Sequence, residues 1–209
     1  DIDFLGIHNV VALRGDAVKT ETYFKPEKNG HAFAKDLVEQ IVKMNHGTYL
    51  DESLENSACT DFNIGVAGYP EKHMEAASLE QDIYHLKKKV EAGADYIVTQ
   101  MFFDNQKYYD FVEKCRTSGI NVPIIPGLKP ITTKSQLSMI PHRFKVDLPN
   151  ELVIAIAKAK DNKEVKEIGI NWCIQQSKDL MKNGAPVLHY YSMGKSEVVK
   201  RIASEVFKD

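Results

Sequence analysis

The sequence contains no apolar stretch that approaches the about 20 residues of a membrane span, although 43% of its 209 residues are hydrophobic. Its first residues, Asp1-Ile2-Asp3-Phe4, lack the basic and then apolar character of a secretory signal. We therefore expect no membrane partner.

There is also no excess of basic residues. The 27 Lys and Arg residues stand against 29 Asp and Glu residues, which gives a net charge of −2. A nucleic-acid partner is therefore not expected, because binding to the phosphate backbone depends on positive charge. No low-complexity segment or Pro/Ser-rich linker interrupts the chain, so we interpret residues 1–209 as a single domain.

Cysteine is scarce: only Cys59, Cys115 and Cys173 are present, far apart and odd in number. This usage fits neither a disulfide framework nor a zinc site, and we expect no metal. A reduced compartment, with the cytoplasm as the default, is the prediction.

Several catalytic and phosphate-binding motifs are missing as well. Neither G-x-G-x-x-G nor G-x-x-x-x-G-K-[ST] occurs, which argues against a doubly wound nucleotide-binding sheet. No Ser-His or Cys-His pair and no H-E-x-x-H can be assembled, and no predicted strand contains the Lys that a Schiff-base site needs. What remains is a planar cofactor whose own chemistry performs the reaction.

The segment at residues 10–16 is the most informative one present. Val10, Val11, Ala12 and Leu13 form an apolar run that is typical of a strand buried on both faces, and Arg14-Gly15-Asp16 follows directly. Charge at the carboxyl end of a buried strand is typical of an α/β active site. The alternative is a structural Arg14–Asp16 pair that closes a tight turn.

Strands and helices alternate along the whole chain. The patterns predict strands at 10–13, 62–67, 96–102, 122–125 and 187–191. They predict helices at 31–45, 79–92, 107–117, 135–140 and 195–207, with two more within 150–182 and a break near 160–163. This order predicts an α/β fold with a parallel sheet and right-handed crossovers.

Polar or special residues follow each of the five strands, and in a parallel sheet these ends meet at one rim. A (β/α)₈ TIM barrel is therefore favoured, but five strands cannot close one. The chain is either a fragment of a barrel or an open sheet. The polar or special residues at the strand ends are Arg14 and Asp16, Tyr69 and His73, Gln100 and Asp104, Gly127 and Lys129, and His189 and Tyr191.

Three groups of side chains could bind a ligand. Gln100 offers a donor and an acceptor to a heterocycle, or is simply satisfied by neighbouring backbone. Tyr69 and His73 could pack on a flat cofactor or be loop residues without a role. Tyr190 and Tyr191 should point to opposite sides of the last strand. One side of the helix at 79–92 could hold a pyrophosphate or be a solvated face; it carries Asp82, His85, Lys88 and Lys89.

These segments together resemble one known family, methylenetetrahydrofolate reductase, in order and at matching spacing over almost the whole chain. The resemblance rests on 10–16 (VVALRGD), 64–70 (IGVAGYP) with His73, 91–95 (EAGAD), 99–103 (TQMFF), 123–127 (PIIPG) and 189–191 (HYY). It implies an FAD-containing (β/α)₈ barrel that reduces methylenetetrahydrofolate to methyltetrahydrofolate. NADH or NADPH would donate the electrons in a ping-pong hydride transfer. A homo-oligomer is expected.

The resemblance also implies roles for individual residues. The implied cofactor-binding residues are Arg14, Gly15, Asp16, Phe33, Ala34, Ala67, Tyr69, His73, Asp82, His85, Lys88 and Lys89. The implied contacts to the folate or the nicotinamide are Gln100, Tyr191 and Lys195. Asp16 is the implied catalytic residue: near the pyrimidine edge of the flavin, its carboxylate would oppose full anion formation and favour a cationic iminium folate.

In two respects the chain departs from the family. An aromatic residue usually follows the Pro-Gly corresponding to Pro126-Gly127, where this chain has Lys134. The family's general acid is a Glu at the end of its first strand, whereas residues 10–13 match the fourth. We therefore expect the chain to cover strands 4–8 of an N-terminally incomplete barrel. The alternatives are a flavin barrel of another specificity, such as a proline-dehydrogenase-like enzyme, and an inactive fragment that serves as a binding module.

Overall fold

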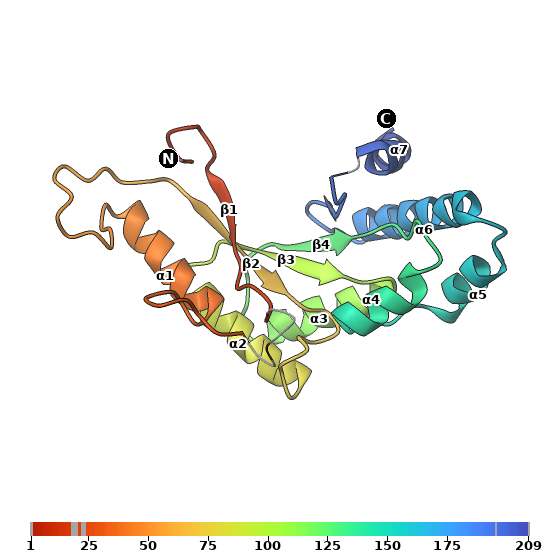
Figure 1. Cartoon of the computed structure of the whole chain (residues 1–209), viewed down its shortest axis with the longest axis horizontal. Helices are drawn as coiled ribbons and strands as arrows, with labels where there is room; N and C mark the ends of the chain where they lie inside the picture. Colours follow the sequence, from red (N-terminus) through yellow and green to blue (C-terminus); the bar gives the residue numbers. More distant parts are fainter. Residues whose placement is uncertain (1, 18–20, 22–23, 195, 209) are drawn as a thin grey trace.

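The computed structural model describes residues 2–17, 21, 24–194 and 196–208, and its centre is a sheet of parallel strands (Figure 1). The strands are β1 (Asn9–Ala12), β2 (Asn63–Gly68), β3 (Tyr96–Met101), β4 (Ile124–Leu128) and β5 (His189–Tyr190). They pair in the order β1-β2-β3-β4-β5. The predicted parallel α/β fold is confirmed.

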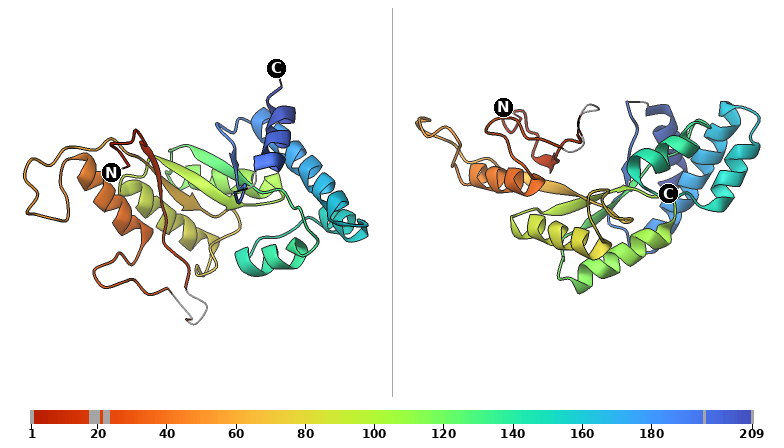
Figure 2. Two further views of the ribbon diagram at one scale, coloured as in Figure 1. Left: turned by 45° about the horizontal axis from the view of Figure 1, so that its top comes forward. Right: turned by 60° about the horizontal axis from the view of Figure 1, so that its bottom comes forward.

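Helices follow the strands, and those of residues 79–117 lie along one side of the sheet (Figure 2). The helices are α1 (Ala34–Asn45), α2 (Leu79–Glu91), α3 (Asn105–Thr117), α4 (Gln136–Phe144), α5 (Asn150–Lys158), α6 (Asn162–Lys182) and α7 (Ser196–Val206). Side-chain caps set three of their starts: Ser78 accepts from the Gln81 N–H, Asp104 from Gln106, and Asp161 from Lys163 and Glu164. Among the described residues, no helix is long and apolar enough to cross a membrane.

The main core lies between the sheet and these helices. Ile64, Val66 and Ile97 of the strands pack in one cluster with Ile83 and Phe111 of the helices, all nearly inaccessible to solvent. Each such side chain contributes about 1.5–3 kcal/mol on burial, so this cluster holds the carboxyl ends of the strands in place. A second cluster lies under α4, α5 and α6.

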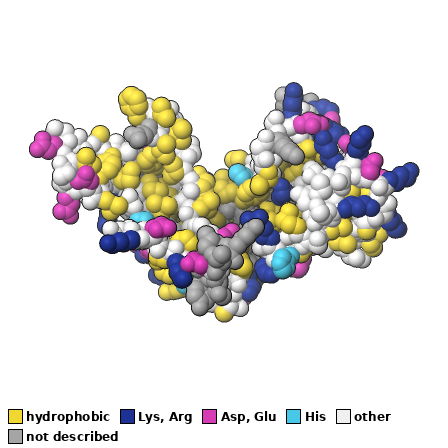
Figure 3. Space-filling view, in the orientation of Figure 1, with side chains coloured by type: hydrophobic (Ala, Val, Ile, Leu, Met, Phe, Trp, Pro, Cys, Tyr) yellow, Lys and Arg dark blue, Asp and Glu magenta, His cyan; other side chains and the backbone are white. Residues whose placement is uncertain are grey.

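Strand β1 differs from its prediction because it is not buried on both faces. Ala12 is buried, but 43% of Val11 and 57% of Leu13 is exposed. The reason is its position: in the sheet that the described residues form, β1 is an edge strand that pairs with β2 on one side, and helix α1 packs against it. Figure 3 shows hydrophobic side chains gathered over β1 and the segment before it, where Phe4 and Leu5 are also exposed.

Strand β4 begins and ends later than predicted, because Pro126, Gly127 and Leu128 belong to it. Pro126 has no N–H to donate to the ladder, and the pairing of β3 with β4 shifts register between Val98 and Met101. The N–H of Gly127 instead donates to the Thr99 hydroxyl at 2.9 Å. Long-range pairing of this kind has no local sequence signal.

Other boundaries also move. Helix α1 begins at Ala34 rather than at residue 31, so Phe33 is its N-cap, 62% exposed, and not part of its apolar face. Helix α4 runs on to Phe144 with Pro141 inside it, and β5 is only two residues long. The predicted break between the two helices within 150–182 is confirmed, since α5 ends at Lys158 and α6 begins at Asn162.

Candidate functional site

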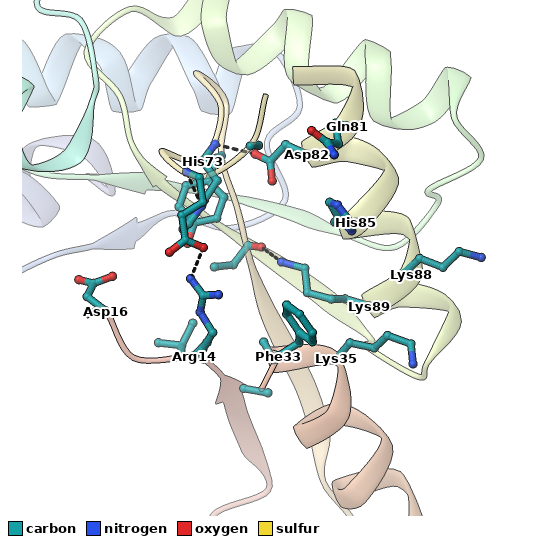
Figure 4. A pocket seen from close by; sticks show the side chains of 17 residues that line it. Arg14, Asp16, Phe33, Lys35, His73, Gln81, Asp82, His85, Lys88 and Lys89 are labelled. Carbon is teal, nitrogen blue, oxygen red and sulfur yellow. Dashed lines mark hydrogen bonds and ion pairs between the residues drawn. The ribbon is translucent and has the colours of Figure 1, made fainter. Parts of the chain in front are cut away.

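A cleft of about 390 Å³ lies at the carboxyl ends of β1 and β2, between α1 and α2 (Figure 4). Its volume is in the range of small-molecule sites. Ala12 and Ala67 contribute small side chains from the two adjacent strands, which leaves room for a ligand next to the sheet.

The cleft brings together the residues that the sequence assigned to a cofactor, with one exception. Gly15 does not line it, although Arg14 and Asp16 on either side do. The predicted residues that line the cleft are Arg14, Asp16, Phe33, Ala34, Ala67, Tyr69, His73, Asp82, His85, Lys88 and Lys89. The stripe along α2 therefore borders a cavity, although His85 and part of Lys88 are exposed to solvent.

Sequence reasoning missed other members of the lining: Ala12, Leu13, Lys35, Glu75, Ala76 and Gln81. Lys35 directly follows Ala34, and Glu75 lies two residues after His73. Adjacency to predicted residues is the signal that could have found them.

Arg14 is held by Glu75 from the loop after β2, with 2.5 Å between Nη2 and Oε2. The Arg14 guanidinium also lies 5.2 Å from the ring centre of Phe24. The alternative of a structural Arg14–Asp16 pair is therefore wrong. The Arg14–Glu75 pair ties the end of β1 to the loop that carries Tyr69 and His73.

His73 is fixed from two sides. Its backbone N–H donates to Asp82 Oδ2 at 2.8 Å, and its Nδ1 accepts from the backbone N–H of Glu75 at 3.1 Å. Burial lowers the pKa of His73, which favours the neutral ring. With Nδ1 accepting, the ring hydrogen is on Nε2, so His73 offers a neutral N–H donor.

Tyr69 packs edge-on against His73, with ring centres 4.6 Å apart. Burial, followed by the nearby charges of Asp82 and Asp16, raises the pKa of Tyr69 to about 12. The phenol therefore stays protonated over the physiological range. Together these two uncharged rings line the cleft with aromatic surfaces set at 77° to each other.

Lysines gather at the α1–α2 end of the cleft (Figure 4). Lys89 is partly buried and donates to the Ala67 carbonyl oxygen at 2.6 Å; burial lowers its pKa to about 8, against the opposing effect of Asp82. Lys88 and Lys35 are more exposed and pair with Glu91 and Glu39, respectively.

Gln100 and Tyr191, two of the predicted substrate residues, do not line this cleft. The Gln100 side-chain oxygen accepts from the N–H of Met101 at 3.0 Å, which is the backbone satisfaction considered as its alternative. Tyr191 donates to the Thr99 carbonyl oxygen, and Tyr190 bonds the hydroxyl of Ser177 in α6. Those partners confirm that the two tyrosines point to opposite sides. Lys195 lies outside the described residues.

Lys134 donates to the carbonyl oxygen of Ala157 at 3.2 Å, near the end of α5. Within the described part of the chain, His, Cys, Asp and Glu form no group of three or more that could hold a metal ion.

These features define a class of protein: a parallel α/β fold whose cleft, at the carboxyl ends of two strands, suits a flat ligand that carries negative charge at one end. The chain matches the methylenetetrahydrofolate reductase family over residues 1–206. It belongs to that family.

Three relatives illustrate the match. Identity is 38% to "Methylenetetrahydrofolate reductase (NADH) 1" of Arabidopsis thaliana, over 90% of this chain and 31% of that protein. It is 33% to "Probable methylenetetrahydrofolate reductase (NADPH)" of Caenorhabditis elegans, over 95% of this chain and 28% of the relative. It is 34% to "5,10-methylenetetrahydrofolate reductase" of Escherichia coli strain K12, over 92% of this chain and 58% of the relative. The chain thus spans less than two thirds of each.

Proposed function

We propose that this chain is part of an enzyme that reduces 5,10-methylenetetrahydrofolate to 5-methyltetrahydrofolate, with FAD as cofactor and NADH or NADPH as donor. One observation carries the proposal. Residues from four separate segments, which the family resemblance assigns to the flavin, line a single cleft. The printed names of the relatives, which include NADH and NADPH forms, support the reaction and a nicotinamide donor.

The chemistry of the cleft fits FAD. Lys88 and Lys89 supply positive charge for a pyrophosphate at one end, and Tyr69 and His73 supply uncharged aromatic rings toward the other, either of which could pack on a flat ligand. A bound flavin would supply the ability to accept a hydride from the nicotinamide and deliver it to the folate.

Asp16 lies at the opposite end from the lysines, close enough to Tyr69 for its charge to raise the pKa of the phenol (Figure 4). We propose that its carboxylate adjusts the charge of the reacting groups and favours the cationic folate. His73 would donate a hydrogen bond from Nε2 to the flavin and so hold the flavin ring in its orientation. Gln100, Tyr191 and Lys195 are the proposed contacts to folate or nicotinamide.

We further propose that β1–β5 are strands 4–8 of a (β/α)₈ barrel. The sequential parallel order supports this, as does the exposure of Val11 in β1 and of Leu13 just after it, since closure of a barrel would enclose the face of the sheet on which they lie. A general-acid Glu is expected on an upstream strand. A homo-oligomer and a cytoplasmic location remain predictions.

The visible spectrum of the purified full-length protein tests the proposal. A flavin spectrum that NADH or NADPH bleaches, and that methylenetetrahydrofolate restores without oxygen, is the expected result. A flavin spectrum without this cycle of bleaching by NADH or NADPH and restoration by the folate would favour a flavin barrel of another specificity, such as a proline-dehydrogenase-like enzyme. A colourless protein that binds no flavin would favour the binding module.

A further inference from the structure

Lys35 occupies an unfavourable position in its own helix. It is the second residue of α1, in the first turn, where the positive end of the helix dipole repels a cation. Its ion pair is with Glu39, four residues later, and this Lys-before-Glu order is the weaker orientation. The local structure of α1 therefore gives only a weak reason for a lysine here.

The cleft supplies a reason. Lys35 lines the cleft from α1, and Lys88 lines it from α2. Figure 4 shows both side chains extending at the same end, away from Arg14 and Asp16. Their present partners, Glu39 and Glu91, do not line the cleft, and these ion pairs are partly exposed. Exposed pairs contribute little, so a ligand could displace them at low cost.

The acidic residues of the cleft do not cancel this charge. Glu75 is paired with Arg14, and Asp82 accepts from the His73 backbone and lies near Lys89. The α1–α2 end of the cleft consequently carries more cations than anions, and the partly exposed ion pairs of Lys35 and Lys88 can give way to an anion with more than one charge.

We propose that Lys35 is a phosphate-binding residue, and that with Lys88 it clamps the diphosphate of a dinucleotide across the mouth of the cleft. The inference rests on the proposed function in taking FAD as that dinucleotide. It adds a contact from α1, where the sequence placed only Phe33 and Ala34. Binding of the diphosphate would offset the unfavourable interaction of Lys35 with the helix dipole. Lys35 would therefore slightly destabilise the protein without a ligand and stabilise the protein with the dinucleotide bound.

The test compares Lys35→Gln and Lys35→Arg in the full-length protein, with Lys43→Gln as the matched control. Lys43 is in the last turn of the same helix, is exposed and lies outside the cleft. Affinities for FAD, riboflavin and ADP are measured by fluorescence titration or calorimetry at two salt concentrations, and the melting temperature is measured without flavin.

We expect Lys35→Gln to weaken the binding of FAD and of ADP by about 3- to 10-fold, as for the loss of one partly exposed charge contact. The salt dependence of both affinities should also decrease. Riboflavin, which has no phosphate, should bind as before, and Lys35→Arg should restore the affinity. The flavin-free melting temperature should not fall in Lys35→Gln but should fall slightly in Lys43→Gln, which loses a favourable dipole interaction.

Unchanged FAD affinity in Lys35→Gln, an equal loss for riboflavin, or a lower melting temperature would each overturn the inference. Failure of the proposed cofactor looks different. If the wild-type protein bound ADP in a Lys35-dependent way but neither FAD nor riboflavin, the lysine clamp would stand and FAD would be the wrong ligand. Binding of none of the three would reject both.

Discussion

The hydroxyl of Tyr191 donates a hydrogen bond of 2.8 Å to the backbone carbonyl oxygen of Thr99, and so joins the end of β5 to β3 across the intervening strand β4. The two residues can meet because Gly127 of β4 lies beneath them without a side chain. A Cβ added there would lie 2.1 Å from the Thr99 oxygen and 2.7 Å from the Tyr191 ring.

Gly127→Ala should therefore destabilise the fold by about 3 kcal/mol or more, because neither the backbone of β3 nor the ring can move away freely. Tyr191→Phe, which removes only the hydrogen bond, should cost about 1 kcal/mol. Urea unfolding measures both. Gly184→Ala is the control: its Cβ would meet no atom within 4 Å, so only the positive φ opposes it, at about 1 kcal/mol. Equal stabilities of Gly127→Ala and Gly184→Ala would reject the steric explanation.

Asp16→Asn should slow reduction of the folate more than reduction of the flavin by NADH or NADPH. The physical reason is that the folate must become a cationic iminium before it accepts the hydride, and the carboxylate favours that cation, whereas the nicotinamide enters the first half-reaction with a neutral ring. Anaerobic stopped-flow absorbance separates the two half-reactions. Equal slowing of both would count against the proposed role.

Lys89 should make cofactor affinity depend on pH. Its pKa is lowered to about 8 by burial, so its charge is lost as the pH rises through that value, or somewhat higher when a phosphate is nearby. FAD affinity should fall by about 10- to 100-fold between pH 7 and 10, in line with the loss of a charged hydrogen bond. The Lys89→Met variant should bind FAD weakly at every pH, whereas the FAD affinity of Lys88→Met should still fall as the pH rises.

The flavin-free protein should show the opposite trend through the same group. Between pH 8 and Lys89's ordinary pKa of 10.5, the unfolded chain binds more protons than the folded one, so the free energy of unfolding should rise with pH. Denaturant titrations of wild type and Lys89→Met measure this difference. If the free energy of unfolding of the wild type varied with pH in the same way as that of Lys89→Met, burial would not lower the pKa of Lys89.

The raised pKa of Glu71 predicts a separate dependence of protein stability on pH. Burial raises its pKa to about 7, although its Oε2 accepts from the backbone N–H of Asp147 at 3.0 Å. Between its ordinary pKa of 4.5 and 7, the folded state binds more protons than the unfolded chain, so stability should decrease as the pH rises.

The decrease at Glu71 should be about 1–2 kcal/mol, because partial exposure screens the effect. Glu71→Gln should remove it, and Glu55→Gln, in an exposed loop, should not. Thermal unfolding from pH 5 to 8 is the measurement, and parallel curves for wild type and Glu71→Gln would contradict the assignment.

The sequence alone determined the alternation of strands and helices, the cap at Ser78 and the stripe of polar residues on α2. Such features depend on residues within one or two turns of each other, through spacing and capping. Most residues of the cleft could also be predicted from the sequence, because each follows the carboxyl end of a strand or belongs to the next helix and faces that strand end.

Only the tertiary structure decided which partner each of these residues has. Arg14 pairs with Glu75, 61 residues away, rather than with Asp16, two residues away. Likewise the tautomer of His73, the depth of Lys89 and the cleft-facing position of Lys35 depend on how α1, α2 and the β2 loop pack together. The exposure of β1 depends on its place at the edge of the sheet. Burial and long-range contacts set these properties, and no local pattern encodes them.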